Sequence, residues 1–214
     1  MRTIAVIARK GGSGKTTIAY HIAIAAERRG WKAVIADSDP QRSAIIARQA
    51  RADLLGPEVT ATAGAKLYPL QMSAVRDGAE VLLIDTPAAL HEEIVNAVAL
   101  CDFCLLIVRP TFLDLAAAVH TLQLVRPLRK PMLAVINQAP PSRAGVEAPV
   151  VTKAFRALAA MQVAVAPPVI RSRQVYQTAM ERGRSAEEMD DDIAAKEIAD
   201  LWAFIERFGF KPRT

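Results

Sequence analysis

Residues 3–17 read TIAVIARKGGSGKTT, and this stretch decides the fold. Residues 3–8 are apolar on both faces, which is typical of a buried parallel strand. The glycine-rich segment that follows leads directly into a helical pattern over residues 15–29, which stops at Gly30. Glycines let successive backbone N–H groups face a phosphate, and the start of a helix adds its positive end. The stretch therefore predicts a phosphate-binding loop between a first strand and a first helix.

The loop differs from the usual G-x-x-x-x-G-K-[ST] pattern, because Arg9 stands where that pattern has its first glycine. In such loops the lysine, here Lys15, reaches the β- and γ-phosphates, and the hydroxyl of Thr16 holds Mg²⁺. The predicted cradle is Gly11, Gly12, Ser13, Gly14, Lys15, Thr16 and Thr17. A glycine-rich turn of purely structural use is the alternative, and the order of strand, Gly-Lys-Thr and helix disfavours it.

Lys10 is a second lysine, on the outer limb of the turn. From there it does not easily reach the phosphates of its own loop. Reaching across a dimer to the nucleotide of a partner subunit would give it a purpose, and a solvated surface lysine is the alternative.

The rest of the chain alternates apolar runs with amphipathic stretches. We expect further strands over residues 32–37, 66–70, 81–85, 103–109, 132–137 and 163–166. We expect further helices over residues 41–51, 91–100, 113–125, 150–161 and 193–207. This order predicts one α/β domain over residues 1–214, a doubly wound and mostly parallel sheet with helices on both faces. Ligands of such sheets bind at the carboxyl ends of the strands.

Composition narrows the class of protein. With 214 residues, 52% of them hydrophobic, the chain suits a single packed core and excludes disorder. Its two cysteines cannot build a disulfide scaffold, and its apolar runs are shorter than the roughly 20 residues of a membrane span. No signal peptide is visible, so we expect a cytoplasmic protein. A net charge of +5 and a pI of about 9.5 hint weakly at a polyanionic partner.

Several ordered motifs together resemble a known family. Residues 10–17, KGGSGKTT, resemble the deviant Walker A loop of the ParA/MinD superfamily of ATPases. Residues 36–41, ADSDPQ, are similar to its D-x-D-P-Q motif, and residues 81–87, VLLIDTP, to its Walker B strand. Residues 169–176, VIRSRQVY, followed by GRS at 183–185, look like the C-terminal signature of small plasmid-partition ParA proteins of the ParF kind. The resemblance spans essentially the whole chain and implies a P-loop NTPase fold of the SIMIBI type.

The resemblance implies ATP and Mg²⁺ as cofactors and a role for each site residue. Asp85 would bind Mg²⁺ directly or through a water, Asp39 would orient the attacking water, and Asp37 would support the Mg²⁺ shell. The alternatives are a helix N-cap for Asp85 and, for the other pair, the start of the following helix with Pro40 at its first position.

Three further roles follow from the same resemblance. The catalytic residues would be Lys10, Lys15 and Asp39. Of these, Lys10 would contact the nucleotide of the opposite subunit, so that ATP drives dimerisation and hydrolysis undoes it. Asn137 would read the adenine edge with its amide, and Pro168 would flank the base. A turn-forming asparagine is an equally good explanation of Asn137.

Basic residues of the C-terminal third are candidates for non-specific DNA contacts, in line with ParA-type dimers. They are Arg171, Arg173, Arg182, Arg184, Lys211 and Arg213, and solvated helix faces are the alternative for each. The implied function is a positioning ATPase with a weak intrinsic rate. It would dimerise with ATP, bind DNA at the nucleoid, and be released when a small adaptor or centromere-binding protein stimulates hydrolysis. The cargo would be a plasmid, a chromosome or a protein assembly.

Two other functions stay open. A MinD-like protein would lay a C-terminal apolar face on a membrane; here that face comprises Ile198, Leu201, Trp202, Ile205 and Phe208. Acidic neighbours make docking onto the sheet the better interpretation, so no stable membrane association is expected. An iron–sulfur carrier would use Cys101 and Cys104 near a dimer axis, although simple packing suits them better. No motif supports an amidoligase or carboxylase of the same superfamily.

Overall fold

The computed structural model describes residues 1–52, 54–88 and 91–210, and it contains a seven-stranded sheet in the order β3-β2-β4-β1-β5-β6-β7. Every neighbouring pair of strands is parallel. The strands are β1 Arg2–Ile7, β2 Ala33–Asp37, β3 Glu58–Ala61, β4 Val81–Asp85, β5 Phe103–Val108, β6 Met132–Ile136 and β7 Ala164–Val165. The order of the strands reverses around β1, which lies between β4 and β5.

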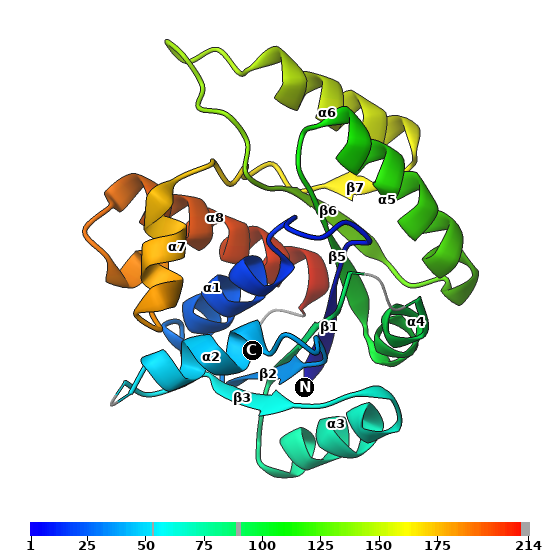
Figure 1. Ribbon diagram of the computed structural model, residues 1–214, viewed down its shortest axis with the longest axis vertical. Coiled ribbons are helices and arrows are strands. Elements are labelled where there is room, and N and C mark those ends of the chain that lie inside the picture. The colour runs from blue at the N-terminus through cyan, green and yellow to red at the C-terminus, as the bar shows by residue number, and fades with distance from the viewer. Residues whose placement is uncertain (53, 89–90, 211–214) are drawn as a thin grey trace.

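Helices cover both faces of this sheet (Figure 1). On one face lie α1 Lys15–Glu27, α2 Ser43–Ala50, α7 Gln174–Glu181 and α8 Asp192–Gly209. On the other lie α3 Leu67–Arg76, α4 His91–Leu100, α5 Phe112–Val125 and α6 Pro149–Ala160. Short 3₁₀ segments, η1 Gly64–Lys66, η2 Arg126–Leu128 and η3 Ala186–Glu188, join some of them.

Burial on both faces explains the continuous apolar runs of the central strands. Along β1, Ile4 and Val6 join the core under α1 and α8, whereas Ala5 and Ile7 join the core under α4 and α5. Because side chains alternate between faces, a strand covered on both sides must be apolar at every position. The predicted α/β class with a parallel, doubly covered sheet is confirmed.

One predicted strand is wrong. Residues 66–70 belong to η1 and α3, and the strand of this region is β3, an edge strand that sequence reasoning missed. The buried positions Leu67 and Ala74 of α3 are seven residues apart, a helical spacing. Pro69 sits in the first turn, where a helix tolerates proline and a central strand does not. β3 escaped notice because none of its residues is fully buried.

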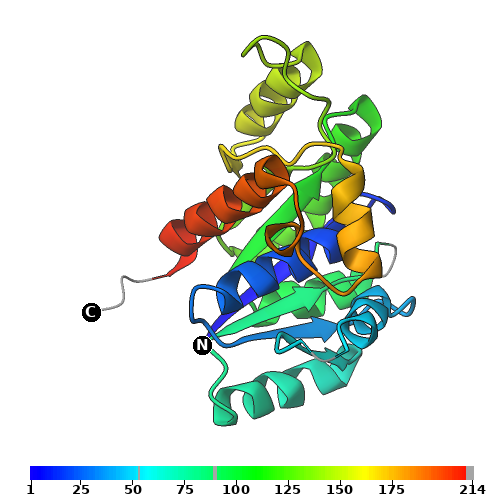
Figure 2. The same cartoon turned by 90° about the vertical axis from the view of Figure 1, so that its left-hand side faces the viewer.

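The C-terminal helix α8 packs on the sheet, as expected. Ile198, Leu201, Trp202 and Ile205 are fully buried in the core that also holds α1, and Phe208 stacks edge-on against Phe103 of β5. Figure 2 shows α8, in red, lying along that face. None of the helices in the described residues has the length and apolar character needed to cross a membrane.

Cys101 and Cys104 lie at the amino end of β5, whereas the predicted phosphate loop follows the carboxyl end of β1. Both thiols are buried, and their sulfur atoms are 3.6 Å apart. The two cysteines therefore pack in the core, at the opposite end of the strands from Lys10. This placement gives no support to the iron–sulfur alternative.

Candidate functional site

The phosphate loop curls over the carboxyl end of β1, and two of its glycines adopt left-handed backbone conformations. Gly12 has φ +71° and Gly14 has φ +90°, which side-chain-bearing residues rarely adopt. A Cβ atom on Gly14 would lie 2.3 Å from Nδ2 of Asn137, whereas one on Gly11 would meet nothing within 4 Å. The loop is therefore tightly packed behind Gly14 and open at Gly11.

Asn137 and Gln138, directly after β6, tie down the back of the loop. Asn137 Nδ2 donates to the carbonyl oxygen of Ser13 at 2.7 Å, and Gln138 Nε2 donates to that of Gly12 at 3.0 Å. The buried amide of Asn137 thus has a structural task that the sequence did not reveal, and its reading of a base stays a prediction. Pro168 lies half-buried between β7 and α7 and does not line the cleft described below.

Two charged groups are buried beneath the loop. Burial lowers the pKa of the Lys15 ammonium, and the carboxylates of Asp85 and Asp39 partly offset that effect. Burial likewise raises the pKa of Asp85, to about 7, against the opposing influences of Thr16 and Lys15. An ammonium and a carboxyl that are both held away from water interact strongly with any charge that enters.

Asp85 fits a cation site at the end of β4. It is fully buried, and neither of its carboxylate oxygens has a hydrogen-bond partner among the described residues. A buried carboxylate without partners is costly, and a metal ion is one group that removes that cost. With the Thr16 hydroxyl beside it, Asp85 supplies the oxygen ligands that Mg²⁺ takes in phosphate loops.

Asp37 and Asp39 diverge although they are two residues apart. The buried carboxylate of Asp37 accepts hydrogen bonds from the backbone N–H groups of Asp39 and Ile45, both at 3.2 Å, so it caps the start of α2. Because α2 begins at Ser43, Pro40 is not at its first position, and the helix-start alternative holds only in that Asp37 accepts the N–H of Ile45 in the first turn. Asp39 accepts from the Gln41 N–H at 2.9 Å, is partly exposed and lines the cleft.

The loop opens into a cleft of about 700 Å³. Its walls come from the phosphate loop, from the segments after β2 and β4, and from α7: Gly11, Gly12, Gly14, Lys15, Thr16, Thr17, Asp39, Pro40, Gln41, Ser43, Pro87, Ala88, Gln177, Met180 and Glu181. Sequence reasoning missed the contribution of α7, because nothing in the local pattern links that helix to a loop some 160 residues earlier.

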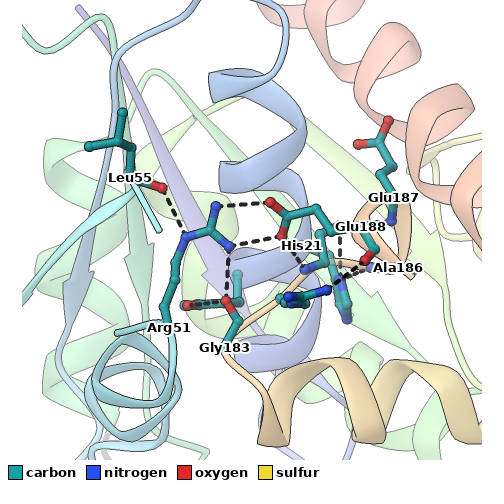
Figure 3. A network of polar contacts seen from close by, with 10 residues as sticks. His21, Arg51, Leu55, Gly183, Ala186, Glu187 and Glu188 are labelled. Carbon is teal, nitrogen blue, oxygen red and sulfur yellow. Dashed lines mark hydrogen bonds and ion pairs between the residues drawn. The ribbon is translucent and has the colours of Figure 1, made fainter. Parts of the chain in front are cut away.

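A polar network holds α7 beside the cleft (Figure 3). Arg51, at the end of α2, donates to the carbonyl oxygen of Gly183 at 2.9 Å and pairs with Glu188 at 2.8 Å. In the same network, Nδ1 of the buried His21 accepts the N–H of Ala186 at 3.1 Å. Gly183 is needed because a Cβ atom there would lie 2.2 Å from the backbone nitrogen of Arg51. The quoted GRS signature therefore fastens α7 and η3 to α1 and α2.

Lys10 lies on the outer side of the loop and is not among the residues that line the cleft. Its Nζ is 3.0 Å from Oδ2 of Asp114, and Nε of Arg109 is 2.8 Å from Oδ1 of the same carboxylate. Arg109 and Asp114 were missed by sequence reasoning. The position of Arg109, directly after a buried strand that ends beside β1, was the available signal.

Two of the arginines predicted to contact DNA are engaged within the chain. Arg171 forms two hydrogen bonds to Glu147, at 2.8 and 2.7 Å, and Arg173 pairs with Glu197 at 2.8 Å. These contacts hold both side chains within the chain, and their use on DNA stays a prediction. Arg182 and Arg184 are exposed at the end of α7, whereas Lys211 and Arg213 lie outside the described residues.

Comparison with known proteins matches residues 4–199 to the model of the CobQ/CobB/MinD/ParA nucleotide binding domain family. The chain belongs to this family. The match covers the loop, Asp85, Asn137 and the start of α8, so the chain is a nucleotide-binding ATPase of the ParA/MinD type.

Individual relatives agree with this family. The chain is 30% identical over 192 residues to maintenance of carboxysome distribution protein A of Halothiobacillus neapolitanus, covering 86% of this chain and 85% of that protein. Its fold superposes on an ATP complex of Cyanothece McdA with a TM-score of 0.75 at 16% identity, covering 100% and 98% of the two chains. A chain of the MinC:MinD cell division protein complex of Aquifex aeolicus gives a TM-score of 0.76 at 15% identity, covering 100% of this chain and 99% of that chain.

Proposed function

We propose that this ParA/MinD-type ATPase positions a cargo by switching between an ATP-bound dimer on DNA and a released monomer. ATP with Mg²⁺ would bind the phosphate loop and form a nucleotide sandwich between two subunits. The dimer would bind DNA without sequence preference, and a small adaptor protein on the cargo would stimulate a slow intrinsic hydrolysis.

The observation that carries this proposal is the placement of the lysines. Lys15 is buried and lines the chain's own cleft, whereas Lys10 lies outside the cleft with 34% of its side chain exposed. The ammonium of Lys10, on the outer side of the loop, could bind the nucleotide phosphates of a second subunit that docks there. Dimerisation would then depend on the γ-phosphate, as a two-state switch requires.

The chain's own residues divide the chemistry of hydrolysis. Lys15 and the loop N–H groups would neutralise the phosphates, and Thr16 with Asp85 would hold Mg²⁺, which supplies further positive charge when bound. Asp39, which lines the cleft, would orient the attacking water. Asp37 holds the backbone of this segment in place through its bonds to Asp39 and Ile45.

The similarity to a carboxysome distribution protein favours a protein assembly over a plasmid as cargo, since that relative matches over most of both chains. A MinD-like attachment to membranes is less well supported, because the apolar face of α8 is buried against the sheet.

The experiment that tests the proposal measures ATPase rate and co-sedimentation with DNA, in ATP and in ADP, at several salt concentrations. We expect binding in ATP, none in ADP, and an affinity that falls steeply with salt because phosphate contacts release counterions. Equal binding in the two nucleotides, or none in either, would overturn the proposal.

A further inference from the structure

A cluster of charged and polar side chains lies on the outer side of the phosphate loop, and none of its members lines the cleft. It consists of Lys10, Arg109, Thr111 and Asp114, and it forms where β5 leads into α5. Asp114 is its centre: Lys10 and Arg109 each contact one of its two oxygens, and the Thr111 hydroxyl donates to Oδ2. Only 2% of the Asp114 side chain is exposed, so the carboxylate is a fixed point to which both cations are attached.

The cluster carries one more positive charge than negative. Contacts with Arg109, Thr111 and Lys10 hold the pKa of Asp114 below its usual range despite burial, so the carboxylate is ionised at neutral pH. Two cations share this single anion, and their side chains are 34% and 25% exposed. The surplus charge faces outward beside the loop and suits an additional anion.

Arg109 has unused hydrogen-bonding capacity. Its Nε is bound to Asp114, whereas Nη1 and Nη2 make no hydrogen bond within the described part of the chain. Nη1 lies 3.9 Å from the position that a Cβ of Gly12 would take, so the guanidinium sits against the loop. The two free nitrogens of an arginine fork match the oxygens of a phosphate.

The placement of the cluster shows which phosphate it can serve. Neither Lys10 nor Arg109 lines the chain's own cleft, although Gly11 and Gly12 next to them do. Beside the cluster, Phe112 and Leu113 are 83% and 63% exposed at the start of α5. An apolar pair next to a surplus charge suits burial against a second copy of the same chain.

We propose that Arg109 is a second cation, alongside Lys10, that contacts the phosphates of the nucleotide held by the opposite subunit. Asp114 is the positioning residue that orients both cations toward the partner. The assignment rests on the nucleotide-dependent dimer of the proposed function and adds to it a residue that the sequence motifs do not contain.

The test compares the dimer dissociation constant with the nucleotide affinity of the monomer, using ATPγS with Mg²⁺ and light scattering after gel filtration. Arg109→Gln should weaken the dimer by at least about 30-fold, as expected for removal of one charge of a desolvated pair. The affinity of the dilute monomer for ATPγS should stay within about threefold, since the side chain lies outside the cleft. Arg156→Gln, which removes an exposed arginine of α6, is the matched control and should behave like the parent chain.

The role of Asp114 is tested by a double-mutant cycle. Asp114→Asn should weaken the dimer by about tenfold in the parent chain and by less than about twofold when Lys10→Ala and Arg109→Gln are already present. An equal effect in both backgrounds would reduce Asp114 to a structural residue and overturn its positioning role. Thermal unfolding midpoints of all variants separate loss of fold from loss of dimer.

The outcomes distinguish the inference from the function on which it rests. A parent chain that binds ATPγS without dimerising refutes both. A parent chain that dimerises, with a dimer lost in Lys10→Ala and retained in Arg109→Gln, refutes the inference alone. An Arg109→Gln monomer that no longer binds ATPγS would also refute it, because the side chain would then act on its own nucleotide.

Discussion

At the residue scale, the site depends on groups that are buried without a full set of protein partners. Asp85 is the clearest of these, since it is fully buried with two carboxylate oxygens that have no hydrogen-bond partner in the described residues. Such a group lowers stability until a cation arrives, which is how a binding site differs from a well-packed core.

Asp85→Asn should separate the role of this carboxylate in cation binding from its cost to stability. We expect the Mg²⁺-dependent ATPase rate to fall by at least about 100-fold, because the amide is a poor ligand for Mg²⁺. The midpoint of thermal unfolding without nucleotide should stay equal or rise, because a buried charge has been removed. The control is Asp190→Asn, which changes an exposed carboxylate. Hydrolysis within about fivefold of the parent rate would contradict the assignment.

At the scale of elements, α7 and η3 join the C-terminal third of the chain to the phosphate-loop helix. The joint depends on the close approach of Gly183 to the end of α2 and on His21, which α1 buries beneath η3. Because α7 lines the cleft with Gln177, Met180 and Glu181, the stability of this joint bears on nucleotide binding.

Gly183→Ala should therefore destabilise the protein by about 2–4 kcal/mol, from the clash with Arg51 and the left-handed backbone together. Gly78→Ala is a matched control, because Gly78 has φ +78° but nothing within 4 Å of its Cβ position. It should lose only about 1 kcal/mol. Urea unfolding measures both, and equal losses would show that the contact with α2 is unimportant.

His21 should make stability depend on pH. Burial lowers its pKa from 6.5 to about 4, so between those values the unfolded chain binds a proton that the folded chain does not. The free energy of unfolding therefore falls as pH drops through this window, by about 2 kcal/mol between pH 7.5 and pH 5. In His21→Gln this part of the dependence should disappear, whereas His120→Gln, which changes an exposed ring, should keep it. Unchanged pH dependence in His21→Gln would contradict the burial effect.

Some helices and strands can be predicted from their sequence patterns and others cannot. The run at residues 66–70 is too short to separate a strand from the first turn of α3, and only its packing under β2 and β4 decides the matter. In contrast, β4 and β5 are predictable, since full burial on both faces leaves an uninterrupted apolar run. α8 is predictable because one face of a long helix is apolar.

At the scale of the whole molecule, basic residues that are close together in the sequence have different surroundings in the structure. Of the arginines proposed for DNA, Arg171 and Arg173 brace the loop before α7 through Glu147 and Glu197. The exposed Arg182 and Arg184 directly follow α7, the helix that lines the cleft. A DNA surface built on them would lie close to the nucleotide.

The double variant Arg182→Ala/Arg184→Ala should lower ATP-dependent DNA affinity by about tenfold or more and reduce the salt slope by about 2. Its thermal midpoint should match that of the parent chain. Arg173→Ala, by comparison, should lower the midpoint, because it leaves Glu197 without one of its partners. Unchanged DNA affinity and salt slope in the double variant would exclude this surface.

The sequence by itself determined the fold class, the phosphate loop and the candidate cation ligand Asp85. These features follow from local order, since a strand, a glycine turn and a helix must succeed one another, and a fully covered strand must be apolar. Only the tertiary structure decided which of the proposed arginines are paired within the chain, that Arg109 and Asp114 lie beside Lys10, and that α7 lines the cleft. These depend on contacts between residues far apart in the chain, from 24 positions for Arg171 with Glu147 to 104 for Lys10 with Asp114, and no local pattern encodes such contacts.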